Sequence, residues 1–360
     1  MTDRHSFDLV LLGFGAVAKA FVRLLRQRSP ALGFHWRVVG VATRRHHCAL
    51  AKEGIDCATL DKLGTTGQFL DTCHDSTIGR QPASTLELLK QLSELYPKRS
   101  KTNRMVIVEN TPFSLEKGQP SVNHVRAALT MDADVITANK GPAAFAYREL
   151  SELATSKDSM FKFEGSVLDG LPVFSLIQET LPGIRVEYVR GIVNTTTNYL
   201  LTAMERGDTL SKALADLQAA GITESDPEKD IEGWDAAAKA TILANVFFGA
   251  NMNPHEVNRK GLRTIDKTDI VRAHQNGQAV KLIAEVKRHN NGVVATVAPQ
   301  LLEASDPLAR LSGTAKGLVI GTDMLGSLVI SKTTSGVGHT AYALMTDLIS
   351  IHRLRTLNVT

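Results

Sequence analysis

The hydrophobic positions in the first part of the chain alternate between short apolar runs and stretches with helical spacing. Apolar runs of strand length occupy residues 7–12, 37–42, 105–109 and 134–137. After the first run, Val17, Phe21, Leu24 and Leu25 fall on one face of a helix, and residues 121–131 show the same spacing. Strands that alternate with helices in this way predict an α/β domain with a parallel sheet.

The second half of the chain has a different pattern. Strand-like apolar runs occupy residues 189–193, 281–287 and 293–302, and two more lie on either side of residues 323–326. The sequence His289-Asn290-Asn291-Gly292 is a hairpin signal between two of these runs. Residues 210–219 have helical spacing. The second half is therefore predicted to be an α+β domain with a largely antiparallel sheet.

A glycine turn separates the first predicted strand from the first predicted helix. Its sequence, Gly13-Phe14-Gly15-Ala16-Val17-Ala18, fits the fingerprint of a Rossmann-type dinucleotide-binding domain. Gly13 permits a tight turn, and Gly15 lets a pyrophosphate approach the backbone at the positive end of the helix that Ala16 and Val17 begin. The alternative is a glycine turn of some other α/β protein.

The second predicted strand ends at the position where an enzyme strict for NAD usually carries an acidic residue. This chain has Thr43-Arg44-Arg45 there. Two guanidinium groups suit the 2′-phosphate of NADP(H), so we favour that cofactor. If Arg44 and Arg45 face solvent, NAD(H) is the alternative.

The next two predicted strands lead into polar segments. Residues 105–109 precede Asn110-Thr111-Pro112, and residues 134–137 precede Ala138-Asn139-Lys140-Gly141-Pro142. Ligands of parallel sheets bind beyond the carboxyl ends of the strands, so Thr111 and Lys140 are candidate binding residues. The alternative for Lys140 is a side chain that points to solvent.

The most informative segment is residues 221–240. Glu224, Asp226, Asp230 and Asp235 form an acidic stretch, and Lys239 follows Asp235 by four residues on one helical face. A carboxylate beside an ammonium suits a small zwitterionic substrate and a lysine that donates a proton. A solvated loop with a surface ion pair is the alternative. The polar residues 194–198 either bind a carboxylate or cap the following helix.

Composition narrows the class of protein. The chain has 360 residues, of which 43% are hydrophobic and 22% charged, with a formal net charge of +4. These values suit a globular protein of two domains, or of one domain with a large insertion, and give no reason to expect a nucleic-acid or membrane partner. The charged amino terminus is unlike a signal peptide. Cys48, Cys57 and Cys73 lack metal-ligand spacing and favour a reducing cytoplasm.

These features together resemble the homoserine dehydrogenases over nearly the whole chain, in the short form without a carboxy-terminal regulatory domain. The most specific match is Glu224 to Lys239, where Glu-x-Asp-Pro is followed by Asp and then Gly-x-Asp-x-x-x-Lys. The other matching segments are the glycine turn, residues 110–112, residues 137–142, Glu164-Gly165-Ser166-Val167 with Gly170-Leu171-Pro172, Gly191-Ile192-Val193-Asn194 with Thr196 and Asn198-Tyr199, and Ser335-Gly336-Val337-Gly338.

The resemblance implies reversible NAD(P)H-dependent reduction of L-aspartate 4-semialdehyde to L-homoserine, a step of threonine and methionine biosynthesis. Carried over by position, Lys140 and Lys239 are the catalytic lysines, and Asp235 helps to bind or orient the substrate. From the chemistry of hydride addition we expect Lys239 to donate the proton, with Asp235 positioning it and Lys140 as its partner near the nicotinamide. Glu224, Asp230 and Thr196 are implied to bind or orient the substrate. The expected cofactor-binding residues are Gly13, Gly15, Ala16, Val17, Arg44, Arg45, Asn110, Thr111, Lys140 and Gly338.

The chain departs from the family pattern at three positions. Thr195 replaces a usual glycine, Ile222 replaces a common aromatic, and Asp169 replaces a small residue. Because of Thr195 and Ile222, a second hypothesis is that the chain is a related oxidoreductase acting on another amino aldehyde or amino alcohol. A third hypothesis is a catalytically silent nucleotide-binding regulator. Because relatives bind a monovalent cation near Asp169, the resemblance implies a Na⁺ site at Glu164, Val167 and Asp169.

The resemblance also implies how the chain is divided. Residues 1–145 plus about 336–360 are expected to form the NAD(P)-binding domain. Residues 146–335 are expected to form the substrate-binding, catalytic domain. The antiparallel sheet of this second domain is expected to supply the interface of a homodimer.

Overall fold

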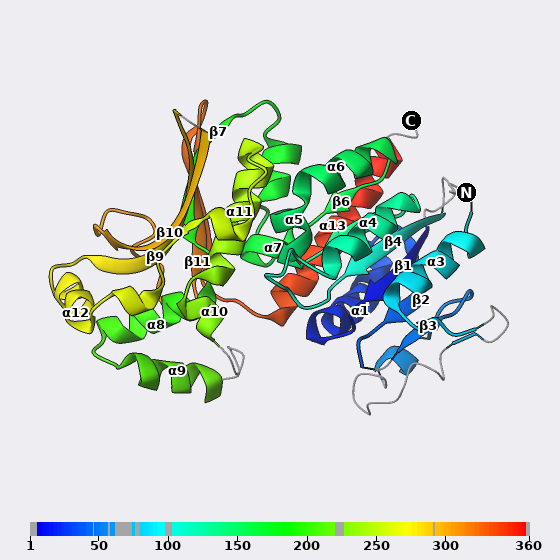
Figure 1. The fold of residues 1–360 in the computed structure, drawn as a ribbon, viewed down its shortest axis with the longest axis horizontal. Coiled ribbons are helices and arrows are strands. Elements are labelled where there is room, and N and C mark those ends of the chain that lie inside the picture. Colours follow the sequence, from blue (N-terminus) through cyan, green and yellow to red (C-terminus); the bar gives the residue numbers. More distant parts are fainter. Residues whose placement is uncertain are drawn as a thin grey trace. The chain divides into compact units, whose positions relative to one another are not determined.

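The structure is a computed structural model that describes residues 6–45, 47–56, 58–61, 74–75, 80–97, 103–219, 227–290 and 292–357. The chain separates into two compact units, drawn in Figure 1. The first contains residues 1–142, 148–170 and 337–360, and the second contains residues 143–147 and 171–336. Each unit has its own sheet.

The sheet of the first unit has the strand order β3-β2-β1-β4-β5-β6. This is the order of a Rossmann-type sheet, and every neighbouring pair is parallel except β2 with β3. The fully buried apolar strands explain why the sequence shows continuous runs rather than alternation. The bounds are β1 (Ser6–Leu12), β2 (His35–Ala42), β3 (Cys48–Leu50), β4 (Asn103–Glu109), β5 (Asp134–Thr137) and β6 (Phe161–Lys162).

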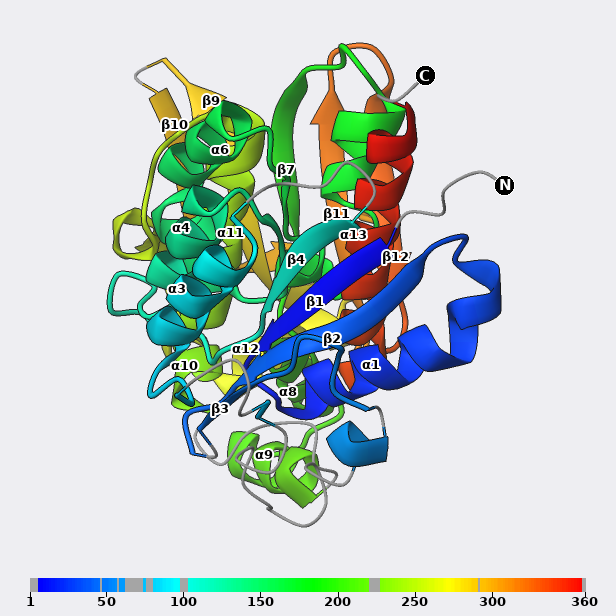
Figure 2. The same cartoon turned by 90° about the vertical axis from the view of Figure 1, so that its right-hand side faces the viewer.

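Helices cover both faces of this sheet (Figure 2). On one side α1 packs against α13, and on the other α3 packs against α4. α1 buries Phe21 and Leu25 in the core, beside Leu344 and Leu348 of α13. The helices are α1 (Ala16–Arg28), α3 (Thr85–Leu95), α4 (Ser121–Thr130), α6 (Tyr147–Ser156), α7 (Gly165–Leu168) and α13 (Val337–Leu357), with a short turn η1 (Ser29–Ala31). α5 (Lys140–Phe145) runs from the first unit into the second.

The division differs from the expected boundary near residue 146. Residues 148–170 belong to the first unit because β6 pairs in parallel with β5 and extends its sheet. The backbone nitrogen of Glu164 also donates to Asp347 Oδ2 of α13 at 3.0 Å. The segment is therefore tied to the first unit through both backbone and side-chain contacts.

The sheet of the second unit has the order β12-β11-β7-β9-β10-β8 and is antiparallel except where β8 joins β10. The predicted hairpin of β9 with β10 is present, and the two predicted strands around residues 323–326, β11 and β12, form a second hairpin. The bounds are β7 (Val186–Ile192), β8 (Asn258–Arg259), β9 (Ala279–His289), β10 (Gly292–Leu302), β11 (Lys316–Thr322) and β12 (Gly326–Lys332).

The central helix of the second unit, α11 (Trp234–Phe248), packs on β9 and β10. Its alanines favour the helix, and Gly249 ends it in the left-handed conformation. The other helices are α8 (Thr195–Glu205), α9 (Leu210–Ala219), α10 (Glu228–Ile231) and α12 (Lys267–Gln275), with short turns η4 (Leu176–Thr180), η5 (Pro254–Glu256) and η6 (Leu262–Thr264).

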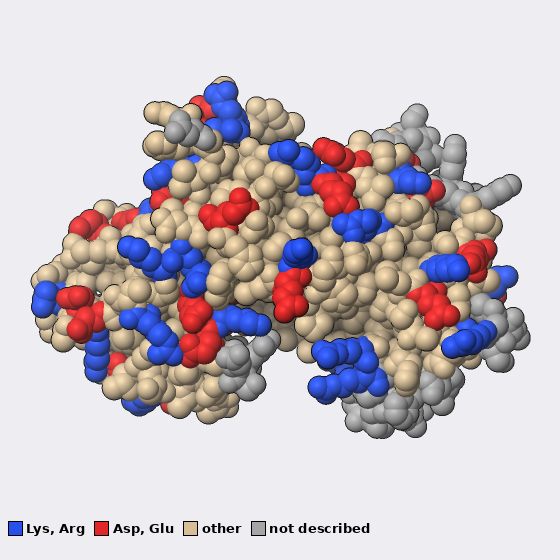
Figure 3. All heavy atoms as spheres, viewed as in Figure 1, with Lys and Arg blue, Asp and Glu red and all other residues tan. Residues whose placement is uncertain are grey.

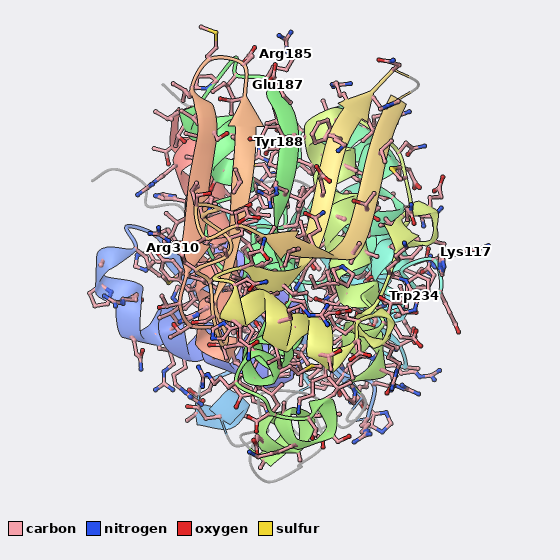
Figure 4. All side chains as sticks on the ribbon, turned by 90° about the vertical axis from the view of Figure 1, so that its left-hand side faces the viewer. Lys117, Arg185, Glu187, Tyr188, Trp234 and Arg310 are labelled. Carbon is pink, nitrogen blue, oxygen red and sulfur yellow. The ribbon has the colours of Figure 1, made fainter. Side chains whose placement is uncertain are left out.

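Tyr188 lies on the other face of this sheet, the face seen in Figure 4. Its ring covers Gly321 on the neighbouring strand, because a Cβ at Gly321 would lie 2.0 Å from a ring carbon. The tyrosine hydroxyl reaches Ser327 Oγ on the next strand, at 2.7 Å. An aromatic ring over a strand glycine thus holds β7, β11 and β12 in register.

None of the described helices is long and apolar enough to cross a membrane. On the surface shown in Figure 3, basic and acidic side chains are interspersed. This distribution agrees with the small net charge of the sequence.

Candidate functional site

The ion pair expected from the sequence lies at the start of α11. Asp235 Oδ2 is 2.7 Å from Lys239 Nζ. Lys239 is largely buried, and its ammonium also donates to the carbonyl oxygen of Val193 at 2.7 Å. The lysine is therefore held between α11 and the end of β7, which is not the arrangement of an ordinary surface pair.

Asn194 connects the acidic residues to the segment that follows β7. Its side-chain nitrogen donates to Asp230 Oδ1 and to Asp235 Oδ2, both at 2.8 Å. Its side-chain oxygen accepts from the backbone nitrogen of Thr197 at 2.8 Å and caps α8. Of the two hypotheses for residues 194–198, capping is confirmed, and the carboxylates that the amide binds belong to the protein itself.

Electrostatics at this cluster are dominated by two neighbouring carboxylates. Burial raises the pKa of Asp230 above its usual range, and the negative charge of Asp235 raises it further. Hydrogen bonds from Thr196 and Asn194 and the charge of Lys239 act in the opposite direction. Within the described residues, the Lys239 ammonium thus stands beside the carboxylates of Asp230 and Asp235 in a poorly solvated environment.

A second set of contacts holds the junction between α10 and α11. The guanidinium of Arg259 lies 3.8 Å from the ring centroid of Trp234 and donates to the carbonyl oxygen of Glu232. Trp234, labelled in Figure 4, donates from its indole nitrogen to Glu232 Oε2 at 3.1 Å. Because Trp234 directly precedes Asp235, the stacked arginine fixes the start of the helix that carries the ion pair.

The structure thus brings together Thr196, Asp230, Asp235 and Lys239, all expected from the sequence. Glu224 and Ile222 lie outside the described residues. Thr195 is the first residue of α8, so the β-branched side chain needs no glycine-only conformation there. Asn194 was expected only as part of the polar segment 194–198 and had no individual role; its sequence signal was a polar residue directly after a predicted strand.

In the first unit, the glycine turn has the geometry that its sequence predicts. Gly13 has φ +89°, and a Cβ there would lie 2.6 Å from the carbonyl oxygen of Asn110. Gly15 precedes α1, and a Cβ there would meet no atom of the described residues within 4 Å. Ala16 and Val17 form the first turn of α1. A glycine is therefore required at position 13, where the backbone of Asn110 approaches closely, whereas Gly15 leaves open space at the start of α1.

Thr111 and Lys140 lie beyond the carboxyl ends of β4 and β5. The side-chain nitrogen of Asn139 donates to the Thr111 carbonyl oxygen at 2.7 Å, and its oxygen accepts from the Gly141 nitrogen at 2.8 Å. Lys140 Nζ lies 4.9 Å from the ring centroid of Phe113. The two strand-end loops are thus joined by Asn139 on one edge of the sheet.

The remaining expected residues of the first unit lie on three other segments. Arg44 and Arg45 are exposed directly after β2, and Gly338 is exposed in the first turn of α13. Glu164 and Val167 are buried. Asp169 adopts the left-handed conformation, with φ +53°, at the end of α7. Ser166 Oγ is buried there and has no hydrogen-bond partner within the part of the chain that the structure describes.

The first unit has a Rossmann-type sheet with an open glycine turn, and the second unit holds a buried lysine against carboxylates. These two features define the class of protein as an NAD(P)-dependent oxidoreductase. The family model described as homoserine dehydrogenase matches residues 172–349. The chain is 33% identical over 355 residues to an NAD(+)-dependent homoserine dehydrogenase from Pseudomonas canavaninivorans, covering 97% of each protein. The chain belongs to the homoserine dehydrogenase family.

Other relatives agree with this assignment. A homoserine dehydrogenase from Methanocaldococcus jannaschii is 33% identical over 350 residues, covering 96% of this chain and 98% of the relative. The crystal structure of a homoserine dehydrogenase from Archaeoglobus fulgidus, described as putative, has a TM-score of 0.81 at 28% identity, covering 96% of this chain and 99% of that one. A hyperthermophilic archaeal homoserine dehydrogenase in complex with NADPH has a TM-score of 0.77 at 27% identity, covering 96% and 97%.

Proposed function

We propose that Lys239 supplies the proton in the reaction of this family, the reversible interconversion of L-aspartate 4-semialdehyde and L-homoserine. The observation that carries the proposal is the buried ammonium of Lys239, held by Asp235 and the Val193 carbonyl. Hydride addition to an aldehyde leaves negative charge on its oxygen, which an ammonium stabilises and protonates. Asp235 orients the lysine through this contact.

The residues of the first unit fit a nicotinamide dinucleotide. Gly15 leaves open space at the start of α1, where a pyrophosphate meets the positive end of the helix. The bound cofactor supplies or accepts the hydride. Lys140 and Thr111, beyond the strand ends, are proposed to contact its nicotinamide portion, and Asn110 and Gly338 are proposed to complete the cofactor site.

Glu224, Asp230 and Thr196 are proposed to bind or orient the substrate, with Glu224 meeting its ammonium group. The proposed role of Asp230 and Thr196 is supported by the hydrogen bond between their side chains, which lies beside Asp235. The direct assay is reduction of NADP⁺ or NAD⁺ with L-homoserine beside a panel of other amino alcohols. A higher kcat/KM for another alcohol would show that the pocket edge, including Ile222, selects a different substrate.

NADP(H) is proposed as the preferred cofactor because Arg44 and Arg45 are exposed where β2 ends. Replacing both with alanine is expected to lower kcat/KM for NADPH by about tenfold and to leave that for NADH nearly unchanged, since only NADPH carries the 2′-phosphate. The measurement is the ratio of the two kcat/KM values. An unchanged ratio contradicts the preference.

A Na⁺ site is proposed at residues 164–169. Its support is the buried carboxylate of Glu164 and the buried, unpartnered hydroxyl oxygen of Ser166, because hard cations take oxygen ligands. Val167 and Asp169 are proposed to contribute backbone carbonyls.

Addition of NaCl is expected to raise the thermal midpoint and activity of the native chain, relative to choline chloride at equal ionic strength. Glu164→Gln is expected to remove this difference, because it removes the negative charge of the site. A salt-specific response that survives in Glu164→Gln would rule out Glu164 as a ligand.

A homodimer is proposed to form through the face of the second sheet that carries Tyr188. By strand register, Val294 and Val329 share this face, and both are exposed. The two valines lie on β10 and β12 of the same sheet, and exposed apolar side chains are a feature of interfaces.

Val329→Lys is therefore expected to convert a dimer into a monomer in light-scattering measurements, because burying a charge opposes association. Leu86→Lys on α3 of the first unit is the matched control, since Leu86 is 47% exposed and Val329 is 52% exposed. The proposal fails if the native chain is a monomer or if Val329→Lys stays dimeric.

A cytoplasmic location and a role in threonine and methionine biosynthesis are proposed with the family activity. Cys48 is a free, buried thiol whose pKa burial raises to about 11. A thiol of this kind is unreactive and serves as part of the core.

A further inference from the structure

A fully buried carboxylate, Glu109, ends strand β4 and is not used in the proposed reaction. Its Oε1 accepts a hydrogen bond from the backbone nitrogen of Thr111 at 3.2 Å and another from the Thr111 hydroxyl. The imidazole Nδ1 of His124, on α4, lies 3.5 Å from the same oxygen. A buried carboxylate in the sheet is therefore directed at the loop that carries Thr111.

Glu109 also connects this loop to the next strand. The hydroxyl of Thr137 donates to the Glu109 carbonyl oxygen at 2.7 Å and accepts from the Asn139 nitrogen at 2.9 Å. Asn139 in turn binds the Thr111 carbonyl oxygen. Thr111 is thus held from two directions, by Glu109 through its side chain and by Asn139 through its backbone.

The hydrogen bonds of Thr111 determine what its hydroxyl can offer to a ligand. A hydroxyl has one hydrogen and two lone pairs, and here the hydrogen points to Glu109 Oε1. Asn139 Nδ2, at 3.5 Å, takes at most one lone pair. Toward a ligand the Thr111 oxygen therefore acts as an acceptor and not as a donor.

The neighbouring residue, Asn110, has a buried side-chain nitrogen that finds no hydrogen-bond partner among the described residues. A shielded amide that the protein does not satisfy costs stability unless a ligand completes its bonds. Rotating the amide by 180° would place its oxygen there instead, and that oxygen would be unsatisfied in the same way. Asn110 and Thr111 together thus present unsatisfied hydrogen-bonding capacity beside the strand end.

We propose that Glu109 is a positioning residue that fixes Thr111 as a hydrogen-bond acceptor for the carboxamide of the nicotinamide ring. A carboxamide donates through its nitrogen, whereas a carboxylate in the same place only accepts and meets the Thr111 oxygen with repulsion. The arrangement selects the amide cofactor over its deamidated acid form. This inference rests on the proposed contact between Thr111 and the nicotinamide portion.

The test measures binding of the cofactor and of its nicotinic acid analogue to the full chain, and compares the ratio of their dissociation constants. The native chain is expected to bind the amide cofactor about a hundredfold more tightly than the acid analogue. A difference of this size is typical when a polar group of a ligand meets a mismatched partner in its site. Glu109→Leu removes the acceptor and is expected to lower this ratio at least tenfold. Glu109→Gln keeps an acceptor oxygen at this position and is expected to retain the ratio to within about threefold.

A double-mutant cycle shows whether Glu109 acts through Thr111. Thr111→Val is expected to lower the ratio by itself, and Glu109→Leu is expected to have no further effect in that background. Asp8→Asn is the control, because Asp8 is a buried carboxylate at the opposite end of the same sheet, bound to Arg37 at 2.6 Å. It is expected to lower stability without changing the ratio.

Additive effects of Glu109→Leu and Thr111→Val would overturn the inference, as would an unchanged ratio in Glu109→Leu. If Glu109→Leu does not fold, the ratio of dissociation constants is compared between Thr111→Val and Thr111→Ser, because only the serine variant keeps the hydroxyl. An unchanged ratio in Thr111→Val then overturns the inference. If the variants bind both the cofactor and its nicotinic acid analogue more weakly, with an unchanged ratio of dissociation constants, the role of Glu109 in selecting the amide is rejected. The proposed contact between Thr111 and the nicotinamide portion is then retained. Unchanged affinity in every variant also rejects the proposed contact of Thr111 with nicotinamide.

Discussion

Replacing Lys239 with alanine is expected to lower kcat for homoserine oxidation by about 10²- to 10⁴-fold, the usual contribution of a positioned general acid or base. The reason is that the ammonium, held by Asp235 at 2.7 Å, has no substitute at that place. Binding of NADPH, measured by fluorescence titration, is expected to change little, since the proposed cofactor residues lie in the other unit of the chain.

Lys281 offers the matched control for this substitution. It is another buried lysine of the second unit, 3.2 Å from Glu205, and burial lowers its pKa. Lys281→Met is expected to lower the thermal midpoint, because it leaves Glu205 unpaired, and to retain kcat at temperatures where the chain is folded. Turnover retained in Lys239→Ala, or lost equally in Lys281→Met, would refute the role of Lys239.

Replacing Gly13 with alanine is expected to destabilise the first unit and abolish measurable cofactor binding. The backbone has φ +89°, which costs a residue with a Cβ about 1–3 kcal/mol. The new Cβ would also lie 2.6 Å from the Asn110 carbonyl oxygen. The expected fall in the thermal midpoint is about 5 °C or more.

Gly15→Ala separates the steric effect on the cofactor from the effect on the fold. A Cβ at Gly15 meets nothing within 4 Å, so the thermal midpoint is expected to stay unchanged. The same Cβ occupies space that the pyrophosphate needs, and cofactor affinity is expected to fall by about tenfold or more. If Gly15→Ala binds the cofactor as tightly as the native chain, the pyrophosphate does not approach the backbone there.

Much of the fold could be predicted from the sequence because its signals are local. The glycine turn after β1, the spacing of Asp235 and Lys239, and the hairpin around Asn290 each depend on residues that are close together in the chain. The structure confirms these elements. The homoserine dehydrogenase family was also recognisable from the spacing of its motifs.

The contacts that complete the site depend on residues far apart in the sequence. Asn194 binds Asp230 and Asp235, which are 36 and 41 residues away. Nothing in the local pattern of residues 194–198 specifies those partners, so capping and carboxylate binding were equally good hypotheses. The sequence also did not indicate that residues 148–170 belong to the first unit. Strand β6, which joins them to its sheet, has only two residues and leaves no periodic signal.

The position of helix α13 has a consequence for folding during synthesis. Its residues Ala341, Leu344, Leu348 and Ile351 share a hydrophobic core with Phe7 and Leu9 of the first strand. The ribosome completes residues 171–336, nearly all of the second unit, before these side chains exist. At about 5–20 residues per second, the apolar face of α1 waits roughly 15–65 s for its covering helix. The newly made first unit therefore leaves this apolar face uncovered until α13 has been synthesised.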